Sequence, residues 1–121
     1  MKLRAYDIDN DRFYYSEDYA DMSRFFAMCE ALLSAGYDVI YQNYIGKKDK
    51  RDKYIYEGME VEMEMNYKLT LKGVYSSFFV KGVIKYFENH CQFALYNSQD
   101  QYEFHPISGT ESLHITKEKG F

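Results

Sequence analysis

The chain has 121 residues, a length typical of one compact domain or of one domain with a small appendage. Its formal net charge of −4 argues against general nucleic-acid binding, which needs a basic footprint. No apolar run reaches membrane-spanning length and the first residues lack an apolar signal region, so we expect a cytoplasmic protein without membrane contact. The two cysteines, Cys29 and Cys91, have no metal-ligand spacing and are expected to be buried free thiols in a reducing compartment.

The charge is distributed unevenly along the chain. Residues 1–40 carry four basic and eight acidic side chains, residues 41–56 carry five and two, and residues 57–121 carry six and nine. Aromatic residues make up 19% of the chain, with 14 tyrosines and no tryptophan. Because tyrosine suits strands and half-exposed interfaces, this composition favours a β-rich protein with amphipathic surfaces.

The N-terminal residues predict a β-hairpin followed by a helix. Residues 2–6 alternate in polarity, an acidic turn follows, and residues 13–15 form a returning aromatic strand. Residues 16–35 predict the helix, with Ser16 as its N-cap and Gly36 just beyond its end. Its apolar stripe consists of Met22, Phe25, Phe26, Cys29, Leu32 and Leu33, which is typical of a face packed on a core.

The acidic turn within the hairpin resembles the beginning of a calcium-binding loop. Asp7, Asp9 and Asp11 have the spacing of the first EF-hand ligands. However, Arg12 stands where that loop requires glycine, and Asp18 stands where it requires a bidentate glutamate. We therefore expect a solvated turn and no metal or other cofactor.

The rest of the chain predicts short strands separated by turns. The expected strands are residues 37–45, 54–56, 59–65, 66–73, 74–80, 83–87, 91–96, 102–105 and 112–116. Tight turns are expected at residues 57–58, 81–82 and 88–90, and residues 117–121 are expected to be loose.

This pattern predicts an α+β fold that is mostly antiparallel β. An N-terminal hairpin and one helix would be followed by a small, strongly bent sheet or SH3-like barrel. The expected division places the hairpin, helix and basic loop in residues 1–56 and the barrel-like half in residues 57–121, together forming one compact unit.

Three blocks of the sequence resemble the YopX-like proteins of phages and prophages. Residues 3–7 read Leu-Arg-Ala-Tyr-Asp and residues 13–15 Phe-Tyr-Tyr, similar to the opening of that family. Residues 44–50 and 55–61 are similar to its central signature, the second stretch beginning Ile-Tyr-Glu-Gly. Residues 82–86, Phe93 and residues 105–108 are similar to its C-terminal half. The resemblance implies a phage or prophage origin and no established activity.

The chain departs from the family pattern at several positions. Ile45 replaces a threonine, Arg51 and Asp52 replace an Asn-Gly turn, and Met59 replaces an acidic residue. The sequence also diverges after Ser108. No catalytic residue is carried over from the family.

Acidic residues provide the first candidate binding surface. Met59, Val61, Met63 and Met65 alternate with Glu60, Glu62 and Glu64, so the glutamates should form a row on the solvent face of one strand. With Glu17, Asp18 and Asp21, this row could bind a basic groove of another protein, since complementary charge speeds encounter. The competing interpretation is an ordinary solvated face.

Basic residues provide the second candidate surface. Lys47, Lys48, Lys50, Arg51 and Lys53 lie close in sequence to Tyr44 and Tyr54. Basic and aromatic side chains on a sheet can bind single-stranded nucleic acid by charge and stacking. The competing interpretation is a solvated hairpin tip.

The sequence thus leads to two hypotheses and argues against a third. The first is a non-enzymatic phage accessory protein that binds another protein, such as a nuclease of a host defence system of the CRISPR type. The second is a nucleic-acid-binding accessory module, and either could be a homo-oligomer through its edge strands. An enzyme would require His90, His105 or His114 to converge with carboxylates, and their spacing does not indicate this.

Overall fold

The computed structural model describes residues 2–68, 73, 75–97, 104–107 and 112–121. The chain forms two compact units, Met1–Tyr44 and Ile45–Phe121, which are described separately. The observed boundary follows Tyr44, whereas the sequence suggested a division after residue 56, so the basic loop belongs to the second unit. The described residues are mostly antiparallel strands with one α-helix, which confirms the predicted α+β class.

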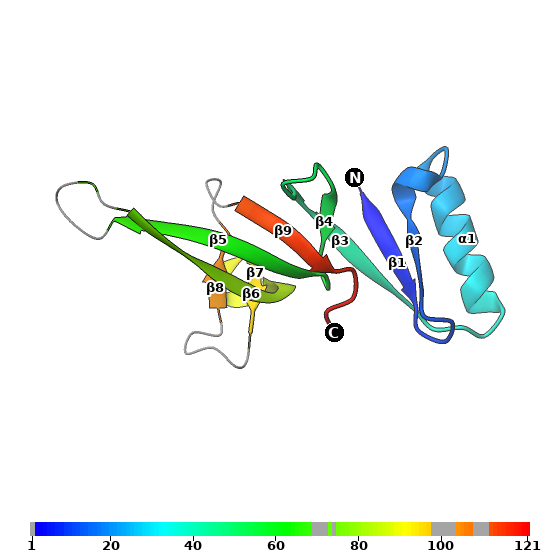
Figure 1. The fold of residues 1–121 in the computed structure, drawn as a ribbon. Coiled ribbons are helices and arrows are strands. Elements are labelled where there is room, and N and C mark those ends of the chain that lie inside the picture. The colour runs from blue at the N-terminus through cyan, green and yellow to red at the C-terminus, as the bar shows by residue number, and fades with distance from the viewer. Residues whose placement is uncertain (1, 69–72, 74, 98–103, 108–111) are drawn as a thin grey trace. The chain divides into compact units, whose positions relative to one another are not determined.

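The first unit is a sheet covered on one face by a helix. Strands β1 (Leu3–Asp7) and β2 (Arg12–Tyr15) form the predicted hairpin, and β1 also pairs with β3 (Val39–Lys48), so that β1 is central. Helix α1 (Met22–Ser34) lies against this sheet (Figure 1). Its Phe25 and Cys29 are fully buried against Leu3 and Ala5 of β1, as the apolar stripe predicts.

The opposite face of β1 carries a buried arginine. The Arg4 guanidinium lies 4.1 Å from the centre of the Phe13 ring, and Nε donates a 2.7 Å hydrogen bond to Oε1 of Gln42. Ring and amide contacts of this kind offset the desolvation of a buried charge. On the same face, the Tyr6 hydroxyl donates to Asp11, which closes the hairpin turn.

The helix begins six residues later than the sequence indicated. Ser16 begins a short 3-10 helix, η1 (Ser16–Asp18), and its hydroxyl accepts the backbone N–H of Leu3 at 3.0 Å. The N-cap of α1 is instead Asp21, whose carboxylate accepts the N–H of Arg24 at 2.9 Å. Serine and aspartate are both good N-cap residues. Ser16 does not cap α1, because its hydroxyl instead accepts the backbone N–H of Leu3.

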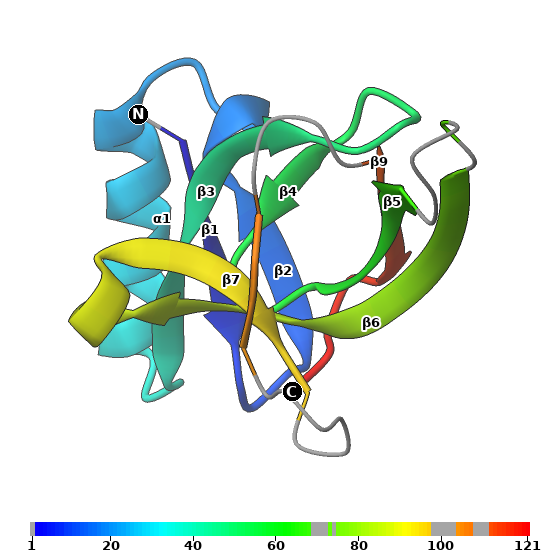
Figure 2. The same ribbon diagram turned by 90° about the vertical axis from the view of Figure 1, so that its left-hand side faces the viewer.

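The second unit is built around a five-stranded antiparallel sheet. Its strands lie in the order β8 (Phe104–Pro106), β7 (Gln92–Tyr96), β6 (Tyr75–Phe87), β5 (Glu60–Lys68) and β9 (Ser112–Lys117). Strands β6 and β7 bend strongly (Figure 2), in agreement with the predicted bent sheet. The inward residues form the core: Ile55, Tyr56, Met59, Val61, Met63, Val80, Ile84, Ala94, Leu95 and Leu113.

Strand β6 continues through the place where a turn was predicted. Lys81 and Gly82 lie in the middle of β6, so the predicted turn at these residues is wrong. A Cβ atom on Gly82 would lie 2.8 Å from the carbonyl oxygen of Tyr96 on β7. The glycine is therefore needed for close approach of two strands and not for a turn. The hairpin of β6, η2 (Glu88–His90) and β7 is confirmed.

The C-terminal residues, which were expected to be loose, are held by the fold. Lys117 belongs to β9, and the N–H of Gly120 donates to the carbonyl of Gly58 at 2.8 Å.

The two cysteines differ in exposure. Cys29 is buried, which raises the pKa of its thiol. Cys91 is exposed, so the expectation of two buried thiols is wrong for Cys91. The strands expected at residues 66–73 and 74–80 are only partly described, since residues 69–72 and 74 lie outside the described range.

Candidate interaction surfaces

The basic loop of the second unit is organised by one buried carboxylate. The loop joins the end of β3 to β4 (Tyr54–Tyr56). The side chain of Asp49 is fully buried, and Oδ1 accepts the N–H groups of Arg51 at 2.9 Å and Lys53 at 3.0 Å. Oδ2 accepts the N–H of Ile115 on β9 at 3.3 Å and lies 3.5 Å from Nε of Arg51. Asp49 therefore holds the turn together and fastens it to a strand far away in sequence.

Burial and hydrogen bonding act in opposite directions on the Asp49 carboxyl. Desolvation alone would raise its pKa. The N–H groups of Lys53, Ile115 and Arg51, together with the Arg51 charge, outweigh this effect and lower the pKa below its usual 3.8. The carboxylate is therefore ionised at neutral pH and makes strong, charge-assisted hydrogen bonds.

The loop also covers the outer edge of β9. The N–H of Lys50 donates to the carbonyl of Leu113 at 2.8 Å, and Nη2 of Arg51 donates to the carbonyl of Ile115 at 3.2 Å. These groups occupy backbone positions that an edge strand would otherwise leave open. The interpretation of the basic run as only a solvated hairpin tip is therefore incomplete.

The cations of the loop remain accessible despite these contacts. Lys48, Lys50, Arg51 and Lys53 are exposed, and Lys47 is half-buried. Lys48 lies 3.4 Å from the Asp52 carboxylate and 5.0 Å from the centre of the Tyr54 ring. Tyr44, the other tyrosine predicted for this surface, is half-buried and ends the first unit.

The predicted glutamate row lies on β5, in the interior of the sheet. Val61 and Met63 are fully buried on the opposite face, as the alternation predicts. Glu60 accepts the Thr116 hydroxyl at 2.7 Å and lies 4.0 Å from Nζ of Lys117. The row is therefore flanked by basic and hydroxyl groups and is not a purely acidic surface.

The remaining glutamates differ in their neighbours. Glu62 lies opposite Lys81 on β6 and His114 on β9, whereas Glu64 lies opposite Phe79 and Ser112. The Phe79 side chain is 62% exposed, the highest value among the exposed large hydrophobic residues of the described chain. Opposite residues of neighbouring strands share one face of a sheet, so this face combines an exposed aromatic ring with half-exposed carboxylates.

Within the described residues, β5 and β6 continue beyond Glu64 as a two-stranded arm. In this part of the chain, β9 pairs with β5 as far as Glu64, and β7 pairs with β6 from Val83 onward. Strands β5 and β6 pair with each other up to Lys68 and Tyr75 (Figure 1). Phe78 and Phe79 lie on opposite faces of β6, and both are exposed.

The other predicted acidic residues lie in the first unit. Glu17 and Asp18 are exposed in η1, and Asp21 caps α1 and lies 4.0 Å from Nε of Arg24. Of the three, Asp21 acts at the positive end of the helix, where a carboxylate is favourable. These three residues belong to the first unit, whereas the glutamate row belongs to the second unit.

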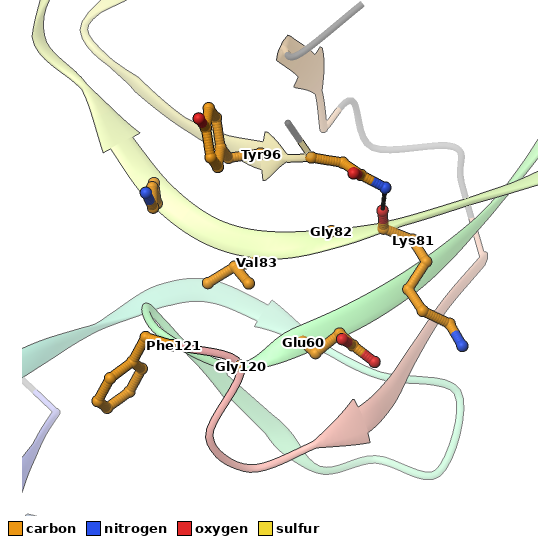
Figure 3. A pocket seen from close by; sticks show the side chains of 9 residues that line it. Glu60, Lys81, Gly82, Val83, Tyr96, Gly120 and Phe121 are labelled. Atoms are coloured by element: carbon orange, nitrogen blue, oxygen red, sulfur yellow. Dashed lines mark hydrogen bonds between the residues drawn. The ribbon is translucent and has the colours of Figure 1, made fainter. Parts of the chain in front are cut away.

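A hollow of about 310 Å³ lies beside the glutamate row (Figure 3). Its walls come from β5, β6, β7 and the C-terminal residues Gly120 and Phe121. Nζ of Lys85 lies 4.0 Å from the centre of the Tyr96 ring, and Nδ2 of Asn97 donates to the carbonyl of Lys81 at 2.8 Å. The hollow is therefore lined by both acidic and basic side chains, namely Glu60, Lys81 and Lys85.

The three histidines lie on separate elements of the second unit. His90 is in η2, His105 in β8 and His114 in β9, and β8 and β9 are opposite edges of the sheet. Within the described ranges, no group of three or more His, Cys, Asp or Glu side chains could hold a metal ion. In the part of the chain that the structure describes, no helix is long and apolar enough to cross a membrane.

Comparisons with known proteins returned no match. No protein-family model matches the chain, and neither the curated proteins nor the solved structures contain a significant match. The described residues define only a strand-rich α+β fold. The resemblance to the YopX-like family stays a prediction.

Proposed function

We propose that this chain is a non-enzymatic accessory protein that acts by binding another protein. The observation that carries the proposal is the exposed Phe79 ring on the same face as Glu62 and Glu64. Protein interfaces typically combine a few large aromatic anchors with a polar rim. An exposed phenylalanine beside a row of charged residues on a sheet has this composition, so the face is the best candidate for contact with a partner.

The resemblance to phage and prophage proteins suggests the kind of partner. In that setting, an attractive target is a nucleic-acid-handling protein of the host, such as a defence nuclease of the CRISPR type. Its basic groove would receive Glu62 and Glu64, and complementary charge would speed association. Because Lys81 and Lys117 lie beside the glutamates, we assign the anchoring role to Phe79 and a steering role to the carboxylates.

Affinity capture with matched variants tests the proposal. We expect the tagged chain to enrich one protein from nuclease-treated lysate of a bacterial host, and the purified pair to bind each other. The Glu62→Lys/Glu64→Lys/Phe79→Ser variant should bind at least tenfold more weakly, since loss of an aromatic anchor typically costs about 2 kcal/mol or more.

The control for this experiment places the same charge change elsewhere on the second unit. Glu88 and Glu118 are exposed and lie outside the glutamate row. The Glu88→Lys/Glu118→Lys variant should bind as tightly as the wild-type chain. Equal weakening by both variants, or a captured protein whose binding is insensitive to the triple change, would contradict the assignment of this face.

Nucleic-acid binding by the basic loop is a second candidate function. The specific observation in its favour is that the buried Asp49 fixes the turn and leaves Lys50, Arg51 and Lys53 exposed. We expect fluorescence anisotropy with single-stranded oligonucleotides to show affinity that falls with salt. Lys50→Glu/Lys53→Glu should reduce the salt slope by about two, whereas Lys81→Glu/Lys85→Glu, away from the loop, should leave it unchanged. No binding at low salt would eliminate this candidate.

A further inference from the structure

Among the strands that the structure describes, none pairs with the outer edge of β6 beyond its contact with β7. Strand β7 pairs with residues 83–87 of β6, whereas β5 pairs with residues 75–83 along the other edge. Residues 75–79 therefore form an edge that no described strand covers. Unpaired backbone groups on a strand edge are a template for the addition of another strand.

The hydrogen bonds of β6 show which residues face this edge. The N–H of Ile84 donates to Met59 and its carbonyl accepts from Gly58, so Ile84 faces the β5 side. The carbonyl of Lys81 accepts from Asn97 on the opposite side. Since backbone direction alternates and the register with β5 is unbroken, the odd-numbered residues face outward. The open edge therefore presents the N–H and C=O groups of Tyr75, Ser77 and Phe79.

The sequence of this edge has none of the usual devices against strand addition. Residues 75–80 read Tyr-Ser-Ser-Phe-Phe-Val and contain no charge and no proline. Short uncharged segments of high β-propensity are those that associate most readily. The Asn97 side chain occupies the next outward carbonyl, that of Lys81, so the described part of the open edge is the stretch from Tyr75 to Phe79, with Ser77 in its middle.

We propose that two copies of this chain associate through antiparallel pairing of their β6 edges about a two-fold axis at Ser77. This pairing places Ser77 opposite its own counterpart, and Tyr75 opposite Phe79 of the second copy on both sides of the axis. Each opposite pair exchanges two backbone hydrogen bonds. The contact is self-complementary, as a two-fold interface requires, and it brings no like charges together.

The same pairing would stabilise the two-stranded arm formed by β5 and β6. A two-stranded ribbon is marginally stable in water, and joining two arms makes a four-stranded sheet. The inference depends on the backbone of the β6 edge and does not rest on the proposed function, which uses the side chains of the neighbouring face.

A proline scan at the centre of the edge tests the dimer. The Ser77 N–H faces away from β5, so Ser77→Pro removes an outward donor and leaves the β5–β6 ladder intact. Ser77→Ala keeps the N–H and is the matched control. We expect light scattering after size exclusion to give twice the 14.5 kDa monomer mass for wild type and Ser77→Ala at high concentration. Ser77→Pro should weaken association by roughly tenfold or more, since two central hydrogen bonds are lost.

Covalent capture provides a second test that does not depend on the proline variant. Opposite residues in a hydrogen-bonded antiparallel pair have Cα atoms about 5.5 Å apart, a separation that suits a disulfide. With the exposed Cys91 replaced by serine, Ser77→Cys should form a covalent dimer under copper-catalysed oxidation. Asn89→Cys, exposed on η2, should react at least tenfold more slowly. A wild-type chain that stays monomeric at all concentrations, equal association of Ser77→Pro and Ser77→Ala, or equal oxidation rates would each overturn the proposal.

Discussion

Phe25→Ala should lower the free energy of unfolding by about 3–5 kcal/mol, the usual cost of removing a buried phenylalanine. Phe25 is fully buried in the first unit. Its ring centre lies 5.6 Å from that of Tyr19, 5.7 Å from that of Phe26 and 6.5 Å from that of Tyr41. The substitution removes this set of aromatic contacts and leaves a cavity between α1 and the sheet. Urea unfolding followed by far-UV circular dichroism measures the loss.

A second position on the same helix provides the control. Leu33 lies on α1 and is 47% exposed, so Leu33→Ala removes a large apolar side chain that contributes little to the core. We expect Leu33→Ala to cost less than about 1 kcal/mol, since exposed substitutions have small effects. Similar losses for the two variants would show that α1 does not bury the Phe25 side against the sheet.

The difference between these two positions was predictable only in part. The apolar stripe correctly placed Phe25 and Cys29 in the core, but it also included Leu33, which is exposed near the end of α1, so the prediction is wrong there. Alternation correctly identified Val61 and Met63 as core residues of β5. The hairpin of β6 and β7 likewise follows from residues close in sequence. A hydrophobic pattern with a period of 3.6 or 2 residues indicates which side chains face inward. The burial of Phe25, Cys29, Val61 and Met63 confirms this indication for those residues.

The predictions that failed depend on contacts between distant residues. Ser16 has the chemistry of a helix cap, but the Leu3 N–H recruits its hydroxyl and Asp21 caps the helix. Gly82 has the appearance of a turn residue, yet its missing Cβ is required by the Tyr96 carbonyl on the neighbouring strand. A single sequence does not show which distant partner will approach a given residue, so such roles are not readable from it.

The candidate surfaces show the same limit. Alternation predicted the row of Glu60, Glu62 and Glu64, but the register of β6 and β9 determines that Lys81 and His114 flank it. The sequence also gave no indication of the open β6 edge, because that edge depends on where β7 stops pairing. The hydrogen bond from the N–H of Ile115 to Asp49 spans 66 positions of the chain, so local sequence patterns do not indicate it.

Asp49→Ala should therefore destabilise the second unit strongly, by about 3 kcal/mol at neutral pH. Three backbone N–H groups would lose a charged acceptor, and hydrogen bonds to charged groups contribute about 1.5–3 kcal/mol when buried donors depend on them. Asp52→Asn is the matched control, since Asp52 lies in the same turn but its side chain is 84% exposed. We expect urea unfolding to show a loss of less than about 0.5 kcal/mol for Asp52→Asn, because exposed ion pairs contribute little.

The pH dependence of stability in a further variant, Asp49→Asn, distinguishes the contribution of the carboxylate charge from that of packing. The folded-state pKa of Asp49 lies below its ordinary 3.8, so its contribution to stability is present above that value and is lost as pH falls through the folded-state pKa. The stability difference between wild type and Asp49→Asn should therefore be largest at neutral pH and shrink under acid conditions. If the difference stayed constant with pH, the carboxylate charge would not be the source of the stabilisation, and Asp49 would hold the turn by shape and neutral hydrogen bonding alone.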